Sequence, residues 1–428
     1  MQRFIWTCLL LFFFCVLSAQ HCSTRSEWWS DKEQYIPKED TPFFELKVNY
    51  VIPQRADGTG NFSEDDPEHE ALLEDYLSYS NWLWKKLKDP KDETCYPGDD
   101  FVPSTYIRFK LNAIIYVQDD YLWNAENGSA CPNDRNWYLN GLEKEIQENP
   151  DHADAINIYL PNDSSSYFAM IIDQTSFDDP KDKPPCSELP SKKDLNRSSR
   201  INLSGAYNKY WFMKHRVPTD TVLNPKGHSW EGELIGWERS SRGHTIAHEL
   251  GHSMGLQHSN EYHGRNRCHF SIMSQRHGSP HNYLQPSEIG KMHRNLRLTN
   301  IRDFLTHDVY VSNPMVIEGD HVMDMDFKSY EDFIIASGAT LEVSCPISFP
   351  QQASLIIQPG GRLVIGEGTV SGRNTSEEWM GVVVQQYRKP FWKRRKPSEK
   401  GIIETTGEGR ILGKVSKQRL RKSAKRRN

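Results

Sequence analysis

Residues 243–260 read GHTIAHELGHSMGLQHSN, and the spacing of their histidines is the most specific pattern in the sequence. His248 and His252 are four residues apart, so a single helix presents both imidazoles on one face. Gly255 lies three residues after His252, where that helix is expected to end. Glycine suits this position because it tolerates the positive φ that a sharp turn requires. His258 then returns toward the other two rings. The spacing therefore predicts three converging histidines.

The predicted histidine cluster has the ligand set of a catalytic zinc site. Three neutral imidazoles leave one tetrahedral position open for water, and the ion lowers the pKa of that water to roughly 7. Glu249 can take a proton from the attacking water and later pass one to the leaving amine. We therefore predict Zn²⁺ as cofactor, bound by His248, His252 and His258, and Glu249 as the catalytic base of a zinc-dependent endopeptidase. A zinc site without catalysis is the alternative interpretation.

The segment from His248 to His258, HELGHSMGLQH, resembles the zinc-binding motif of the metzincin metallopeptidases. A second hallmark of that family is a methionine in a tight turn beneath the metal. Met273, in the sequence SIMS at residues 271–274, fits this Met-turn. The resemblance thus adds Met273 to the residues expected around the metal.

The flanks extend this resemblance over roughly residues 43–305. Residues 154–159 look like a central sheet strand, and residues 284–293 look like the helix that follows the Met-turn. These flanks lean toward the pappalysin or cytophagalysin branch of bacterial secreted proteases. The resemblance implies a catalytic domain with a mixed twisted sheet, an active-site helix and a Met-turn.

The residue that would stabilise the oxyanion departs from the family pattern. Several metzincin branches place a tyrosine two residues after the methionine, whereas this chain has Gln275 there. Gln275 could donate a weaker amide hydrogen bond to the oxyanion. Alternatively, Tyr262 or Tyr283 could move into the site and stabilise the oxyanion instead. Nearby, His244 is either a support for His248 or a surface residue.

The first residues have the features of a secretory signal peptide. Arg3 precedes an apolar run at residues 5–17, and small residues near Ala19 offer a cleavage site. We expect removal of residues 1–19 and a secreted, extracellular or cell-surface chain, with an uncleaved anchor as the alternative. No other long apolar run exists, and 25% of residues are charged, which excludes a polytopic membrane protein. The expected partners are protein or peptide substrates, with no nucleic acid and no membrane span after signal removal.

The cysteine content also fits an exported chain. Signal removal takes two of the eight cysteines and leaves six, an even number that permits three disulfides. The candidate pairs are Cys186 with Cys268 and Cys95 with Cys131, and the candidate free thiols are Cys22 and Cys345.

Hydrophobic periodicity upstream of the zinc motif predicts an α+β domain with helices packed on a mixed sheet. A polar linker or short pro-region at residues 20–42 would precede it. A helix over residues 66–88 would be capped by Asp65 or Asp66, with Pro67 in its first turn. The other expected elements are strands at residues 47–52, 106–117, 155–160, 167–172 and 200–203, a helix at residues 137–148 and a loop at residues 178–198.

Downstream of the zinc motif, short β-like runs replace the helical pattern. Leu341 and Val343 recur 22 residues later as Leu363 and Ile365, a spacing that suits coils of a parallel β-solenoid. These runs resemble the β-helical, adhesin-like repeats of secreted Bacteroidota proteins, whose usual roles are display and binding. We therefore predict a short all-β, solenoid-like region at residues 325–415 that could bind a surface or a glycan.

Charge is unevenly distributed along the chain. Residues 388–428 hold 16 Lys and Arg and 3 acids, whereas the whole chain has a net charge of −5. Residues 416–428 form a basic tail that is either solvated or able to bind acidic glycans, nucleic acid or lipid headgroups. A second hypothesis for the whole chain is a surface adhesin with a vestigial, non-catalytic zinc domain. The presence of Glu249 favours the enzyme.

Overall fold

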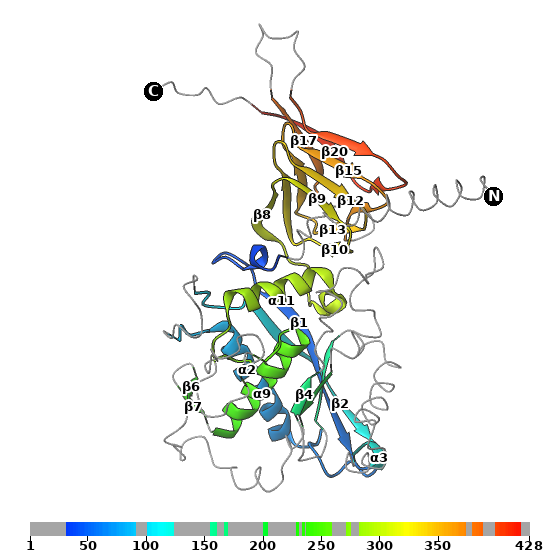
Figure 1. Ribbon diagram of the computed structural model, residues 1–428. Helices are drawn as coiled ribbons and strands as arrows, with labels where there is room; N and C mark the ends of the chain where they lie inside the picture. Colours follow the sequence, from blue (N-terminus) through cyan, green and yellow to red (C-terminus); the bar gives the residue numbers. More distant parts are fainter. Residues whose placement is uncertain are drawn as a thin grey trace, which may run out of the picture. The chain divides into compact units, whose positions relative to one another are not determined.

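The computed structural model of this 428-residue chain has two compact units, residues 32–311 and residues 312–428 together with residues 1–31 (Figure 1). None of the helices it describes has both the length and the hydrophobicity needed to cross a bilayer. The described residues are 31–90, 101–123, 155–160, 167–169, 200–203, 228–230, 233–235, 237–258, 271–274, 282–373, 379–387 and 399–420.

The first unit is built on a five-stranded sheet with the order β2-β1-β3-β5-β4. The β1–β2, β1–β3 and β3–β5 pairs are parallel, and β4 runs antiparallel to β5 at the edge. The predicted mixed sheet is therefore confirmed. The strands are β1 (Phe44–Gln54), β2 (Ile107–Gln118), β3 (Ile156–Tyr159), β4 (Tyr167–Ala169) and β5 (Arg200–Leu203).

Strand β1 lies inside the sheet, and its last seven residues, 48–54, are all buried, as expected where both faces are covered. Asn49 is a polar side chain within this run, and its neighbours satisfy it. Asn49 donates to Asn157 Oδ1 at 3.0 Å and accepts from Asn112 Nδ2 at 2.9 Å. The register between β1 and β2 shifts after Val48, where Asn112 is the extra residue. The three amides therefore hold the bulge in place.

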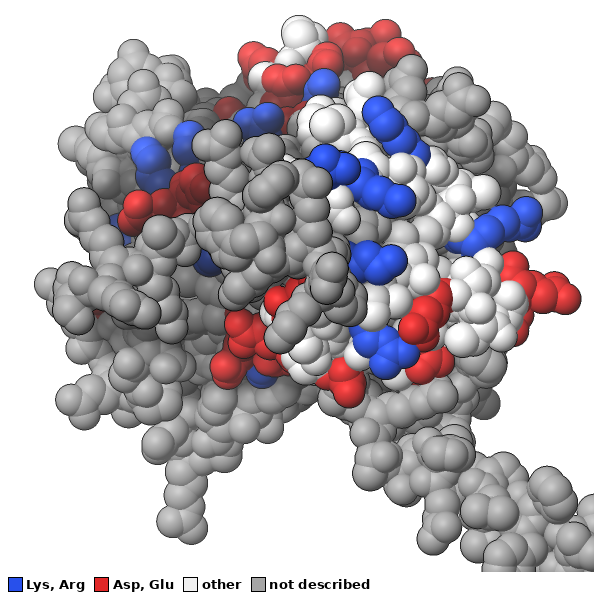
Figure 2. All heavy atoms as spheres, turned by 90° about the horizontal axis from the view of Figure 1, so that it is seen from above, with Lys and Arg blue, Asp and Glu red and all other residues white. Residues whose placement is uncertain are grey.

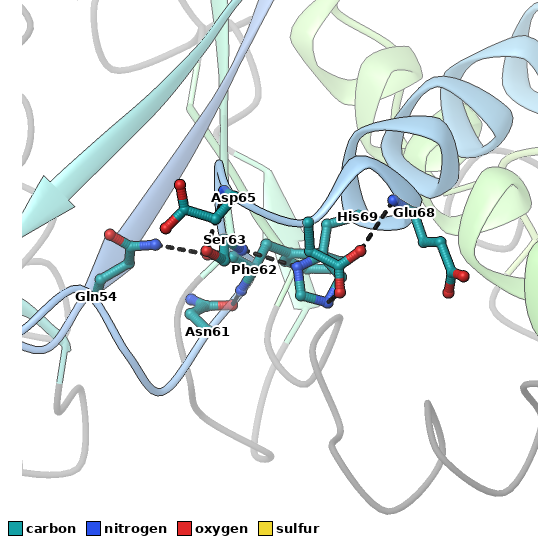
Figure 3. Close-up of polar contacts among 8 residues, drawn as sticks. Gln54, Asn61, Phe62, Ser63, Asp65, Glu68 and His69 are labelled. Atoms are coloured by element: carbon teal, nitrogen blue, oxygen red, sulfur yellow. Dashed lines mark hydrogen bonds and ion pairs between the residues drawn. The ribbon is translucent and has the colours of Figure 1, made fainter.

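Helix α2 (Pro67–Lys85) confirms the predicted helix and ends three residues earlier than expected. Asp66 is the N-cap, and its carboxylate accepts from the backbone N–H of Glu68 at 3.0 Å. The preceding loop is fastened to the same turn, because His69 Nδ1 accepts from the Ser63 N–H at 2.8 Å (Figure 3). Gln54 at the end of β1 donates to the Phe62 carbonyl at 2.7 Å, which joins this cap to the sheet (Figure 3).

The remaining elements of the first unit include the helix that carries His248 and His252. Helix α9 (Trp237–Ser253) packs beside α2, and Trp84 Nε1 of α2 donates to the Ala247 carbonyl at 3.3 Å (Figure 1). Helix α11 (Pro286–Leu298) follows further along the chain. The shorter elements are η2 (Glu33–Tyr35), α3 (Asp120–Trp123), β6 (His228–Trp230), β7 (Glu233–Ile235) and η5 (Asn300–Phe304).

Part of the predicted linker at residues 20–42 is packed into the first unit. Tyr35 of η2 is only 3% exposed, and the Arg297 guanidinium of α11 lies 5.1 Å from the centre of its ring. Gly290 of α11 approaches the Lys32 carbonyl so closely that a Cβ there would clash with it. Residues 32–35 therefore belong to the folded unit.

The second unit consists of three sheets in which every third strand pairs with the next (Figure 1). The sheet orders are β8-β11-β14-β17-β20, β9-β12-β15-β18 and β10-β13-β16-β19, and their described registers are parallel. The strands are β8 (Val311–Ile317), β9 (Asp320–Met323), β10 (Phe327–Lys328), β11 (Glu331–Ile335), β12 (Thr340–Val343), β13 (Ile347–Phe349), β14 (Ser354–Ile357), β15 (Arg362–Ile365), β16 (Thr369–Gly372), β17 (Gly381–Tyr387), β18 (Ile402–Thr405), β19 (Arg410–Ile411) and β20 (Val415–Leu420).

The 22-residue recurrence corresponds to pairing between neighbouring strands. Leu341 is the partner of Leu363, and Val343 is the partner of Ile365. All four of these side chains are fully buried, so like residues stack on like residues inside the unit. The alternating burial of β11, β12 and β13 shows that every second residue points inward.

The expectation that Cys345 is a free thiol is wrong. Its side chain is fully buried in the second unit and is disulfide-bonded, so it is not a free thiol. The spacing of the cysteines could not show this, because pairing depends on which residues the fold brings together. The other cysteines lie outside the described residues, as do the signal peptide (1–19), the predicted helix at 137–148 and the predicted loop at 178–198.

Candidate metal centre

Helix α9 presents two of the predicted ligands on its buried face. His248 and His252 are 9% and 3% exposed, and their ring centres lie 4.9 Å apart. A separation of four residues places both side chains one above the other, as the sequence predicts. The helix itself is anchored to α2 through the Trp84–Ala247 bond, which fixes the position of this face within the unit.

The helix ends in a turn that returns the chain toward the two rings. Gly255 has φ +91°, the left-handed conformation that favours glycine. The N–H of Leu256 donates to the Gly251 carbonyl at 2.9 Å, and the N–H of Gly255 donates to the His252 carbonyl at 2.8 Å. These two bonds define a Schellman motif. The reversal explains how His258, only six residues after His252, reaches the same site.

The three ring systems converge on one point. The candidate ligand atoms of His248, His252 and His258 all lie within 4.8 Å of one another. The Nε2 atoms of His252 and His258 are 3.0 Å apart, and the ring centres of His248 and His258 are 5.2 Å apart. Such a separation is suited to two donor atoms that share one small cation.

Backbone carbonyls fix the orientation of two of these rings. His248 Nδ1 lies 2.8 Å from the Ile272 carbonyl, and His252 Nδ1 lies 2.7 Å from the Leu256 carbonyl. A carbonyl can only accept, so Nδ1 carries the proton in each ring and a neutral ring keeps its lone pair at Nε2. This is the outer-shell arrangement that zinc-binding histidines use.

The electrostatics favour the neutral form of His248. Burial, and then the nearby His252 ring, hold the pKa of His248 well below its usual range, although the hydrogen bond to Ile272 acts in the opposite direction. A neutral imidazole can donate its lone pair to a metal without first losing a proton. The donor type, the tautomers and the convergence of the three rings therefore fit a zinc ion.

Met273 lies against the helix that carries the histidines. It is fully buried, and its sulfur is so close to Gly251 that a Cβ there would clash with it. Residues 271–274 form a tight turn, because the N–H of Ser274 donates to the Ser271 carbonyl at 2.9 Å. The neighbouring Ile272 carbonyl is the one that contacts His248, so this turn touches the cluster directly.

The other predicted site residues have different outcomes. Glu249 is only 5% exposed on α9, between the two helical histidines. Tyr283 is fully buried, and its backbone carbonyl accepts from the Ile272 N–H at 2.9 Å, so it braces the methionine turn. Gln275 and Tyr262 lie outside the described residues. His244 is half-buried and close enough to contribute to the lowered pKa of His248.

Asn295 is a supporting residue that sequence reasoning missed. Its side-chain amide donates to the Met254 carbonyl at 2.8 Å and lies directly against Gly255. Helix α11 thereby holds the end of α9 at the turn that leads to His258. Asn295 is 41 residues from Met254, and no motif in the sequence connects the two.

Comparison with known proteins adds no relative. No model of a known protein family matches the chain, and no curated protein sequence matches it either.

Replacing Gly255 with alanine is expected to weaken zinc binding at least tenfold. The new Cβ would clash with the Asn295 amide, and φ +91° is unfavourable for any residue with a Cβ, so the turn before His258 would have to shift. Chelator competition measures the affinity. Gly338→Ala is the matched control, because Gly338 has φ +86° but no atom within 4 Å of an added Cβ. Equal zinc affinity in both variants would contradict the role assigned to this turn.

Proposed function

We propose that the chain is a secreted zinc-dependent endopeptidase that resembles the metzincins. The observation that carries this proposal is the convergence of His248, His252 and His258, with carbonyl-bound Nδ1 atoms on the two helical rings. An intact glutamate stands beside the first of these ligands in the HExxH order. The apolar run at residues 5–17 supports export of the chain.

Each residue of the site has a definite task in this proposal. The Nε2 atoms of the three histidines would hold the ion, and their neutrality leaves its positive charge undiminished. When bound, zinc would polarise the substrate carbonyl and activate a water molecule for attack. The Glu249 carboxylate would accept the proton of that water and deliver it to the leaving amine nitrogen. The carbonyls of Ile272 and Leu256 would keep two ligand rings from turning.

Several further features support the finer classification. A buried methionine in a tight turn against the active-site helix, at residues 271–274, matches the Met-turn of metzincins. Helix α11 follows this turn, as the resemblance implies. For the second unit, three parallel sheets with every third strand paired are the arrangement expected of a short β-solenoid. We propose that this unit serves in binding or display.

Cleavage of a peptide library by the purified full chain tests the proposed function. We expect mass spectrometry to show internal peptide-bond cleavage by the zinc-loaded protein, its loss on removal of the metal with a chelator, and its return on addition of zinc. Cleavage that persists without metal would contradict the zinc mechanism. No cleavage of any peptide, despite one zinc per chain, would favour the surface adhesin with a vestigial zinc domain.

A further inference from the structure

The last strands of the second unit form an open edge. Strands β18, β19 and β20 end the three sheets, and no further described strand pairs with them. We call residues 379–382 and 399–420 the terminal edge. Two hydrogen bonds join its two segments, from Trp379 Nε1 to the Leu412 carbonyl at 2.7 Å and from the Val382 N–H to the Lys414 carbonyl at 2.8 Å. These bonds hold the two segments side by side at residues 412–414.

The terminal edge carries cations that have no carboxylate partner. In the part of the chain that the structure describes, none of its five Lys and Arg side chains forms an ion pair. Of its three glutamates, Glu404 is already paired with Arg362 at 2.7 Å. The unpaired cations are Lys400, Arg410, Lys414, Lys417 and Arg419. Viewed from the side of β17 and β20, blue Lys and Arg side chains are spread over the white surface, and red acids gather mainly at its margins (Figure 2).

The same edge exposes large apolar side chains. Five exposed large hydrophobic residues occur among the described residues, and four of them belong to the terminal edge. Their exposed fractions are 61% for Met380, 50% for Val415, 47% for Leu412 and 36% for Ile402. Apolar and cationic residues are interspersed in the chain here, since Lys414 lies between Leu412 and Val415. Apolar side chains gathered in one exposed region, with charged residues beside them, are typical of surfaces that bind a partner or a membrane.

The sequence carries more positive charge on both sides of residues 399–420. Tyr387 of β17 and Leu420 of β20 are paired in the sheet, and the chain continues beyond both of them. The continuing sequences, residues 388–398 and 421–428, contain six and five Lys or Arg and no acid. Residues 399–420 therefore lie between two basic stretches of the sequence, and the charge of these stretches has the same sign as that of the terminal edge.

The combination of unpaired cations and exposed apolar side chains identifies one kind of partner. Lys and Arg near an anionic bilayer are attracted to its headgroups, and apolar side chains gain by entering the boundary with the acyl chains. An acidic polysaccharide would use the cations but would leave Met380, Leu412 and Val415 in water. We infer that the terminal edge docks on the surface of an anionic lipid bilayer.

Vesicle sedimentation of the full chain tests this inference. The probes are vesicles of phosphatidylcholine alone and vesicles that contain about one quarter phosphatidylglycerol. We expect binding only to the anionic vesicles. Reversal of three cations, in Lys414→Glu/Lys417→Glu/Arg419→Glu, should weaken it at least tenfold. The apolar variant Met380→Ser/Leu412→Ser should weaken it about fivefold.

Matched controls separate the terminal edge from the rest of the surface. Val316→Ser removes the fifth exposed apolar residue, on β8, and Lys85→Glu/Lys110→Glu reverses exposed cations of the first unit. Both controls should bind like the unaltered chain, and circular dichroism and peptide cleavage should be unchanged in every variant. Equal binding to both kinds of vesicle, or full binding by both edge variants, would overturn the inference. An acidic polysaccharide would instead be identified as the partner by two results together. Vesicle binding would be lost in the charge variant alone, and the unaltered chain and the apolar variant would be retained equally on dextran sulfate.

Discussion

Glu249→Ala protein is expected to keep its fold and one zinc per chain while losing peptide hydrolysis by a factor of about 10²–10⁴. The three ligand rings and their carbonyl partners do not involve the Glu249 side chain, so metal binding should survive. The lost group is the carboxylate proposed to move the proton, and alanine cannot replace it. Elemental analysis for zinc and measurement of kcat/KM on the same preparation check both halves of the result.

Two further variants make this test specific. Glu249→Gln keeps the size of the side chain but cannot accept the proton, and it should be impaired as strongly as Glu249→Ala. Glu70→Gln changes an exposed glutamate on α2 and should retain full activity. Turnover close to normal in Glu249→Ala would contradict the proposed role of this residue.

Substitution of His258 by alanine is expected to remove most of the bound zinc. Two helical histidines would remain, and loss of a direct ligand should cost more than the about 10–100-fold in affinity that loss of an outer-shell partner costs. His258 comes from the segment after the Schellman turn, so its removal leaves α9 and the His248 and His252 rings in place. Zinc content after dialysis and affinity by chelator competition are the measurements.

An exposed histidine provides the control for this second result. His307 lies outside the cluster, and His307→Ala should bind zinc like the unaltered chain. His248→Ala and His252→Ala should lose metal as His258→Ala does. If zinc content is unchanged in His258→Ala, the three-histidine site is wrong and the ion is held by other residues.

Local patterns in the sequence were sufficient for several elements. Asp66, Pro67 and the apolar stripe after them predicted α2 correctly, because capping and helical periodicity depend on residues within a few turns. The spacing of His248, His252 and His258 predicted their convergence for a similar reason, since the helix and its terminal turn fix the geometry over eleven residues. The 22-residue recurrence predicted strand partners because stacked strands repeat their buried positions.

Contacts between distant segments could not be predicted in this way. The Ile272 carbonyl is 24 residues from His248, and the Asn295 amide is 41 residues from Met254, so no local spacing connects them. The same reason explains Cys345, whose pairing depends on the folded chain. The docking of Tyr35 on α11 also escaped prediction, because residues 31–42 have a polar composition with no periodicity.

The hydrogen bonds from His248 and His252 to backbone carbonyls have a consequence for the entropy of metal binding. Free imidazole rings would lose rotational freedom when a cation arrives, and that loss would reduce the affinity. Here two of the three rings are already immobilised by Ile272 and Leu256 when the chain folds. In the proposed site the ordering cost would thus be transferred from the binding step to the folding step, and the metal would meet a donor set that is largely pre-organised.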